Sequence, residues 1–325
     1  MRYVVMGAGA IGGGVGGLLH RAGIETTLVA RGEHLRALQA GGLRLHVGEE
    51  PETALTVPVV AAPAEVELTD QTVVLLAVKS QHTATALDAL VPHLRPETPV
   101  VSLQNGVSNE RALSRRVSRV YSVTVMMPAS HLEPGRVRLH SAGRPALLDI
   151  GRYPTGVDDV ARAIAADLRA AGFDSEPRAD IMAWKYRKLI VNLGNAVDAA
   201  CPVDDDFVSL VQRLHAEAET VLAAAGIPVV SEETDQERRG QLLRPLVDRA
   251  GVGSSTWQSV RRGTGDVEVD HLNGEIVRLG RLHGVPTPAN ELVRRTLHDV
   301  VRRGAAPQSV PAAGLLDQLD QSALS

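Results

Sequence analysis

Three glycines near the amino terminus, Gly7, Gly9 and Gly12, are spaced as G-x-G-x-x-G. They follow a short apolar run and open a segment long enough for a helix. At such a junction the first glycine permits a tight turn, the second lets the backbone approach a pyrophosphate, and the third lets the helix pack closely on the strand. The positive end of the helix and its first amides, those of Ala10 and Ile11, would then hold the phosphates. The pattern favours a dinucleotide-binding site over a glycine-rich turn without a ligand.

The same helix contains four more glycines, Gly13, Gly14, Gly16 and Gly17. Each glycine in a helix interior costs roughly 0.5–1 kcal/mol relative to alanine, so their number needs a reason. We interpret Gly13, Gly14 and Gly16 as an extension of the close packing between this helix and a sheet.

The second apolar run ends at Arg31, where a domain that prefers NAD often has an acidic residue for the ribose hydroxyls. A guanidinium instead suits a 2′-phosphate, because its fork of donors matches phosphate oxygens. The sequence therefore favours NADPH over NADH, although an arginine at a strand end can also be merely solvated. Arg36, one helical turn later, either contributes to binding the 2′-phosphate or faces water.

Four polar residues, Lys185, Lys188, Asn192 and Asn195, recur at steps of 3, 4 and 3 in an otherwise apolar segment. This spacing places them on one face of a helix and suggests a stripe that lines a wet cleft. A lysine there could act as a general acid, and the asparagines could hold substrate oxygens. The alternative is a surface Lys188 with asparagines that hydrogen-bond between helices, and the residues alone leave both readings open.

Two later runs, residues 71–81 and 98–107, are continuously rich in valine and leucine. Such runs suit strands of a parallel sheet that is covered on both faces. Because helix-like segments alternate with them, the sequence predicts a Rossmann-type, doubly wound α/β domain. Lys79 lies at the carboxyl end of the first of these strands, the side where ligands bind in open α/β sheets.

The pattern changes further along the chain. After Met126 come the short runs GRVRLHSAG and ALLDIG, which we interpret as antiparallel strands extending the sheet, and then a helix over 158–171. From about residue 178 strand signals nearly vanish, and helical periodicity marks residues 179–200, 209–226, 241–250 and 269–284. We predict a dinucleotide-binding domain over 1–177, an all-helical domain over 178–304 and a loose tail over 305–325, although one domain stays open.

Composition narrows the function classes. A net charge of −4 with 22% charged residues is ordinary for a globular protein and gives no sign of a nucleic-acid partner. The single cysteine, Cys201, excludes an intramolecular disulfide and a cysteine-built zinc site, and fits a reducing compartment. There is no cleavable leader and no apolar run of about 18 residues, so we expect a cytoplasmic protein without a membrane partner.

Several segments together resemble the ketopantoate reductase (2-dehydropantoate 2-reductase) family over all but the carboxy-terminal tail. They are GAGAIGG (7–13), VARG (29–32), AVKSQHT (77–83), SLQNGV (102–107), KLIVN (188–192), GSSTW (253–257) and EVDHLNGE (268–275). The resemblance implies a Rossmann domain and a helical substrate domain with the active site between them. It also implies hydride transfer from NADPH to the ketone of a 2-oxo acid, with ketopantoate as the expected substrate in pantothenate and coenzyme A synthesis.

The resemblance also implies roles for individual residues. Lys188 would protonate the developing alkoxide, and Glu268 would bind the substrate and the ribose region of the cofactor. Asn105, close to the nicotinamide, and Asn192 would fix the substrate oxygens, with Asn195 as a further substrate contact. Ser255 would bind the substrate carboxylate, although the neighbouring Ser254 stays open for this role, as does a contribution of Lys185 to proton transfer.

Some spacings depart from the family pattern and leave alternatives open. Trp184 precedes Lys188 by four residues instead of two, and Asn195 follows Asn192 by three instead of four. A different 2-oxo acid or an imine, as in opine-type dehydrogenases, is therefore an alternative, as is a non-catalytic NADP(H)-binding protein. A homodimer through the helical half also stays open. Glu268 and His271 form a single E-x-x-H, for which a charged helix face is favoured over a metal site.

Overall fold

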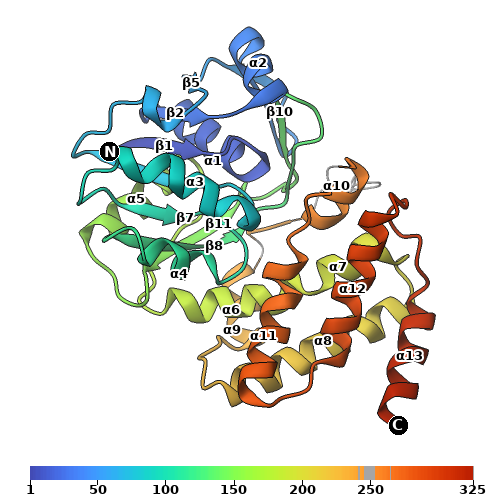
Figure 1. Ribbon diagram of the computed structural model, residues 1–325. Coiled ribbons are helices and arrows are strands. Elements are labelled where there is room, and N and C mark those ends of the chain that lie inside the picture. Colours follow the sequence, from blue (N-terminus) through green and yellow to red (C-terminus); the bar gives the residue numbers. More distant parts are fainter. Residues whose placement is uncertain (241, 245–252, 264, 325) are drawn as a thin grey trace. The chain divides into compact units, whose positions relative to one another are not determined.

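The computed structural model describes residues 1–240, 242–244, 253–263 and 265–324 (Figure 1). The chain forms two compact units, of which the first comprises Met1–Lys185 and Glu232–Arg249 and the second Tyr186–Ser231 and Ala250–Ser325. The chain therefore leaves the first unit, returns to it and leaves it again. These units are defined by packing alone, so the functional boundary expected after residue 177 stays a prediction.

Seven strands form the main sheet of the first unit, in the order β11-β8-β7-β6-β1-β2-β5 (Figure 1). All neighbours are parallel except β8 and β11, which pair antiparallel. The predicted strands are confirmed, and the run ALLDIG extends the sheet as expected. The strands are β1 (Arg2–Met6), β2 (Thr26–Val29), β5 (Val59–Val60), β6 (Thr72–Leu76), β7 (Val100–Ser102), β8 (Val120–Met126) and β11 (Leu147–Arg152).

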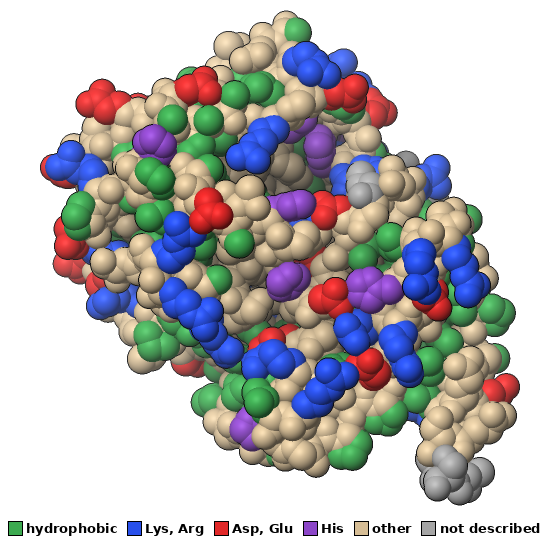
Figure 2. All heavy atoms as spheres, viewed as in Figure 1, with side chains coloured by type: hydrophobic (Ala, Val, Ile, Leu, Met, Phe, Trp, Pro, Cys, Tyr) green, Lys and Arg blue, Asp and Glu red, His purple; other side chains and the backbone are tan. Residues whose placement is uncertain are grey.

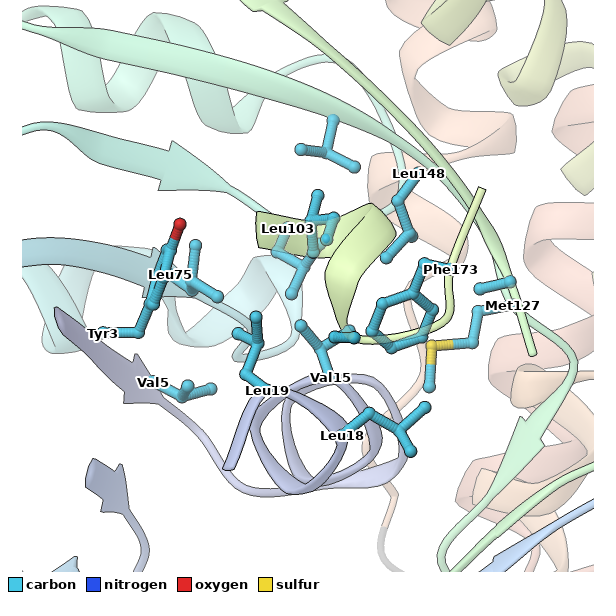
Figure 3. Packing of buried hydrophobic residues seen from close by; sticks show 14 of the residues in the cluster. Tyr3, Val5, Val15, Leu18, Leu19, Leu75, Leu103, Met127, Leu148 and Phe173 are labelled. Carbon is cyan, nitrogen blue, oxygen red and sulfur yellow. The ribbon is translucent and has the colours of Figure 1, made fainter. Parts of the chain in front are cut away.

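The central strands are buried on both faces, as their continuous apolar sequences require. Along β1, Tyr3 and Val5 join the core beneath α1 (Ala10–Arg21) and α5 (Asp159–Ala170), as Figure 3 shows for α1. Val4 and Met6 point the other way and join the core beneath α3 (Thr83–Leu90) and α4 (Asn109–Ser114). Helices on both faces of a largely parallel sheet confirm the predicted doubly wound fold.

A second sheet covers α1 from its other side. Its strands are β4 (Thr53–Leu55), β3 (Leu43–Val47), β10 (Arg136–Leu139) and β9 (Ala129–Ser130), in that order. The prediction that GRVRLHSAG extends the main sheet is therefore wrong, because this run forms β10 and pairs parallel with β3. The cause is packing, since Val137 and Leu139 of β10 are fully buried next to α1.

The glycines of α1 are explained by this position between two sheets. A Cβ on Gly16 would lie 2.6 Å from Leu28 Cδ2 in the main sheet. On the opposite side, a Cβ on Gly14 would lie 2.9 Å from Leu139 Cδ2, and one on Gly17 would lie 2.7 Å from a methyl of Leu43. The predicted close packing of the glycine helix is confirmed, and it involves both sheets.

The remaining elements of the first unit are short connections and one returning helix. They are α2 (Gly32–Gly41), α9 (Glu232–Arg239), and the 3₁₀ turns η1 (Pro63–Glu65), η2 (Ser80–His82) and η3 (Val91–His93). Arg238 ties α9 to the sheet, because its guanidinium donates to Asp149 at 2.7 Å and to Asp174 at 2.5 Å. Only 2% of the Asp149 side chain is exposed, so this is a buried ion pair.

The second unit is all-helical among its described residues. Its elements are most of α6 (Ile181–Asn192), with α7 (Gly194–Ala200), α8 (Asp205–Ala224), α10 (Ser255–Arg261), η4 (Val269–His271), α11 (Asn273–His283), α12 (Pro288–Arg302) and α13 (Ala312–Leu324). Figure 2 shows acidic and basic side chains interspersed on its surface, and Arg281–Glu291 and Arg294–Asp270 are ion pairs of this kind. Of the helix predicted over residues 241–250, only residues 242–244 are described, and they are not helical; the others lie outside the described residues.

Two expectations for this half differ from the structure. The segment 179–200 is two helices, because the Leu193 amide bonds to Ile190 in a tightened turn and its carbonyl accepts from Asn273 at 3.3 Å. The expected loose tail contains α13, whose Leu315 and Leu319 are buried and which packs on α8. Nowhere in the described parts of the chain is a helix long and apolar enough to span a membrane.

Candidate active site

Four loops follow parallel strands at one edge of the main sheet. Gly7 follows β1, Arg31 follows β2, Lys79 follows β6 and Asn105 follows β7. Because β7, β6, β1 and β2 are adjacent and parallel, their carboxyl ends lie at the same edge. The structure thus brings these four predicted residues to the edge where open α/β sheets bind ligands.

The glycines of the first loop meet three different requirements. Gly7 has a φ of 100°, which L side chains rarely adopt. A Cβ on Gly12 would lie 1.9 Å from the Gly7 carbonyl oxygen, so helix and strand can approach only without it. At Gly9 neither reason applies, because its φ is −67° and, beyond its chain neighbours, no described atom lies within 4 Å of a Cβ built there. The space beside Gly9 is open, as the approach of a ligand to this backbone requires.

The start of α1 also suits an anion. Within the described structure no side chain caps this end, and its first turn contains no acidic residue. The first intrahelical bond runs from the Gly13 amide to the Gly9 carbonyl at 2.7 Å. The preceding amides of Ala10, Ile11 and Gly12 have no partner within the helix, and the helix dipole is positive there. These residues fit the pyrophosphate of a dinucleotide.

His34 lies on α2 and hydrogen-bonds to the glycine loop, a contact that was not predicted from the sequence. Its Nδ1 accepts from the Gly135 amide at 2.9 Å, so the proton is on Nε2, which donates to the Ala8 carbonyl at 2.7 Å. Burial lowers the pKa of His34, and the bond to Ala8 opposes this effect only in part. The neutral imidazole therefore fixes the residue between Gly7 and Gly9.

The two arginines near this loop differ. Arg31 is exposed and occupies the position just before α2. Arg36 lies on α2, where its guanidinium is 3.9 Å from the exposed carboxylate of Glu33. Such an exposed pair is typical of a solvated helix face, so Arg31 is the better candidate for a cofactor phosphate.

Lys185 is buried and its ammonium group is already engaged. Its Nζ donates to Glu110 Oε1 at 2.5 Å and to the Gln104 carbonyl at 3.0 Å. Only 3% of the Lys185 side chain and none of the Glu110 side chain is exposed. Ser122 donates to the same Glu110 oxygen at 2.8 Å. Sequence reasoning missed Glu110, because it lies 75 residues from Lys185 and no local motif marks it.

Further buried side chains connect the loops after β6 and β7. Gln104 Nε2 donates to the Val78 carbonyl at 2.8 Å and to Thr83 Oγ1 at 2.9 Å. Thr83 donates to Asn109 Oδ1 at 2.8 Å, and Asn109 Nδ2 donates to the Asn105 carbonyl at 3.0 Å. The side chains of six residues make up what we call the buried network: Gln104, Thr83, Asn109, Lys185, Glu110 and Ser122. It holds the backbone of both loops that carry predicted site residues.

The predicted residues of the helical unit lie on several elements. Lys188 and Asn192 share α6, one turn apart, with Lys188 half-buried and Asn192 buried. Asn195 is on α7, so the predicted stripe does not occupy one continuous helix. Glu268 directly precedes η4, where its carbonyl accepts from the amides of His271 and Leu272.

The two candidate serines have different surroundings. Ser254 caps α10, because its Oγ accepts from the Trp257 amide at 3.2 Å, and its own amide donates to Asp198 at 2.7 Å. Its hydroxyl also donates to the Asn195 carbonyl at 3.3 Å. Ser255 is the first residue of α10 and is exposed. Ser254 therefore has a local structural role, which leaves Ser255 as the candidate ligand.

Comparisons with known proteins identify the family of this chain. Residues 3–154 match the family model "Ketopantoate reductase PanE/ApbA", and residues 180–301 match its C-terminal counterpart. The chain is 32% identical over 315 residues to 2-dehydropantoate 2-reductase of Halobacterium salinarum, covering 93% of this chain and 98% of that protein. It is 29% identical over 303 residues to the protein of that name from Pyrococcus horikoshii, covering 90% and 95%.

Solved structures resemble the chain over the same length. A PanE/ApbA family ketopantoate reductase from Ralstonia eutropha has a TM-score of 0.79 and 31% identity, covering 94% of this chain and 99% of its own. D-mandelate dehydrogenase with NADH and anilino(oxo)acetate has a TM-score of 0.80 at 24% identity, covering 94% and 99%, and shares the fold. The chain belongs to the ketopantoate reductase family of oxidoreductases.

Proposed function

We propose that this chain reduces 2-dehydropantoate (ketopantoate) to pantoate with NADPH, as a step toward pantothenate and coenzyme A. Family membership and near full-length similarity to proteins named 2-dehydropantoate 2-reductase support this reaction. The structural observation that carries its cofactor-binding part is the loop at Gly9, where the backbone is open to a ligand and packing gives no reason for glycine. Arg31, at the end of the adjacent strand, supports NADPH over NADH.

The cofactor would be held by residues of the sheet edge. The amides at the start of α1 suit the pyrophosphate, Arg31 suits the 2′-phosphate, and Lys79 and Asn105 suit the nicotinamide half. Glu268 would bind near the ribose. When bound, NADPH supplies the hydride that adds to the carbonyl carbon of the substrate.

Lys188 would supply the proton. Reduction of a ketone builds negative charge on oxygen, so an ammonium group near that oxygen both stabilises the charge and donates the proton. Lys185 is unsuited to this role, because its ammonium already donates to Glu110 and Gln104. Asn105 and Asn192 would orient the substrate oxygens.

The substrate carboxylate would be bound by other groups. Ser255 suits this role because its side chain is exposed, whereas the Ser254 hydroxyl caps α10. Asn195 would add a further contact to the substrate. A second candidate function, reduction of another 2-oxo acid or an imine, rests on the spacing of Asn192 and Asn195, which differs from the family pattern.

The loss of NADPH absorbance with ketopantoate, beside NADH and a panel of 2-oxo acids, tests the proposal. We expect rapid oxidation of NADPH with ketopantoate and a fall in kcat of about 10²- to 10⁴-fold in Lys188→Ala, the range that a general acid contributes. Turnover of another 2-oxo acid or an imine alone would favour the second candidate. NADPH binding without any turnover would refute catalysis and favour a cofactor-binding protein.

A further inference from the structure

We propose that the buried pair Lys185–Glu110 is a positioning device that fixes Asn105 for the reaction, an inference that rests on the proposed function. Neither side chain of the pair is accessible to substrate, since their exposed fractions are 3% and 0%. Their effect on chemistry must therefore pass through the groups that they hold. The group next to Asn105 in the chain is the Gln104 carbonyl, to which Lys185 donates.

Both peptide groups that flank Asn105 are held by buried side chains. The one before it is fixed through the Gln104 carbonyl, which accepts from Lys185 at 3.0 Å. The one after it is fixed through the Asn105 carbonyl, which accepts from Asn109 at 3.0 Å. With both neighbours anchored, the Asn105 backbone cannot rotate without breaking a buried hydrogen bond, which is costly.

The same network extends to the other loop. The Gln104 side chain donates to the carbonyl of Val78, the residue directly before Lys79. Thr83 bridges the two halves, because its hydroxyl accepts from Gln104 and donates to Asn109. The loops after β6 and β7 are thus linked by side chains to the Lys185–Glu110 pair.

Stability alone is a poor explanation for this pair. Glu110 Oε1 accepts two hydrogen bonds, but its buried Oε2 has no hydrogen-bond partner among the described residues. Buried ion pairs with incompletely satisfied groups are often no more stable than apolar replacements of similar shape. What this pair supplies is a directed donor at the Gln104 carbonyl, which an apolar pair cannot supply.

The neutral double variant Lys185→Met/Glu110→Gln tests the inference. It removes both charges and the bond to Gln104, yet it keeps an acceptor for Ser122. We expect the protein to fold and still to bind NADPH, because the glycine loop is untouched, and kcat to fall about 10- to 100-fold, as supporting groups around an active site typically produce. The fall should not multiply with that of Asn105→Ala when the variants are combined.

Two further variants test whether a fall in kcat comes from the network or from general destabilisation of the unit. Thr83→Val removes only the bridging hydroxyl and should also lower kcat, but by less than the double variant does. It tests the inference even if the double variant folds poorly. Tyr3→Phe removes a hydrogen bond to Asp167 that is part of the same unit but not of the buried network, and should leave kcat unchanged. Hydrogen exchange should be faster at Asn105 in the double variant and unchanged in Tyr3→Phe.

The outcomes separate this inference from the proposed function. A double variant with full kcat, or a loss that multiplies with Asn105→Ala, would overturn the positioning role while the wild-type activity upholds the function. A wild type that reduces no oxo acid would overturn both. Unchanged exchange at Asn105 in a folded double variant would show that the pair does not hold the loop.

Discussion

Replacing Gly9 by alanine should separate cofactor binding from folding. The Gly9 backbone has an ordinary φ of −67°, and no described atom beyond its chain neighbours lies within 4 Å of the added Cβ. The folded chain can therefore accept the methyl group without strain. A pyrophosphate that approaches this backbone cannot, and losing a hydrogen bond to a charged group costs about 1.5–3 kcal/mol, or roughly 10- to 150-fold in affinity.

Gly16→Ala is the matched control on the same helix. Its Cβ would lie 2.6 Å from Leu28 Cδ2 and 3.2 Å from Val5 Cγ2, and both neighbours are fully buried. Overpacking costs about 1–3 kcal/mol, and about 0.5–1 kcal/mol returns through helix propensity. The difference of these ranges is about 0–2.5 kcal/mol, and a net loss near its middle, about 1 kcal/mol, should lower the melting temperature by about 2–4 °C.

Two measurements on each variant separate an effect on cofactor binding from an effect on folding. They are the dissociation constant for NADPH by calorimetry and the thermal unfolding curve. We expect Gly9→Ala to lose affinity at an unchanged melting temperature. Gly16→Ala should melt earlier and bind NADPH as the wild type does once folded. Wild-type affinity in Gly9→Ala would refute the inference that the open space beside Gly9 receives the cofactor.

Three other perturbations have expected outcomes. Arg31→Ala should raise the dissociation constant for NADPH about 10-fold or more, as the loss of a charged contact does, and leave that for NADH nearly unchanged, both by calorimetry. Arg238→Leu should lower the free energy of unfolding by about 3 kcal/mol in a denaturant titration, because Asp149 stays buried with one cation fewer. Because burial holds the pKa of His34 below 6.5, its contribution to stability is complete above pH 6.5 and falls as the pH drops through the folded-state value. His34→Gln should flatten that part of the stability profile.

The sequence was sufficient for the central strands of the main sheet because they are apolar on both faces. Runs such as residues 71–81 have no helical period, so burial on two sides was the simplest interpretation. The second sheet was beyond such reasoning, because β3 and β10 are short and pair across about ninety residues of chain. Their alternation looks the same whether they extend one sheet or begin another, and only contact with the glycines of α1 distinguishes the two.

In the candidate site, too, contacts between residues far apart in the sequence could not be predicted. The glycine loop and Arg31 follow from local patterns, and Asn105 follows from the family resemblance, so Gly9, Arg31 and Asn105 could be named in advance. Glu110 and His34 could not, because each acts on a partner far along the chain and neither has a motif of its own. Sequence patterns identify groups that would face a ligand more readily than the buried groups that hold them.

The distribution of lysine favours separate roles for Lys185 and Lys188. Only three of the chain's 34 cationic Lys and Arg residues are lysines, and the third is Lys79 at the sheet edge. A guanidinium is a broad, planar fork that is always charged, whereas an ammonium is a compact donor that can release a proton. At Lys185 one nitrogen serves a carboxylate at 2.5 Å and a carbonyl at 3.0 Å in a space that admits no solvent, which requires the compact donor. At Lys188 the proposed chemistry requires the proton itself, so arginine would fail at the two positions for different reasons.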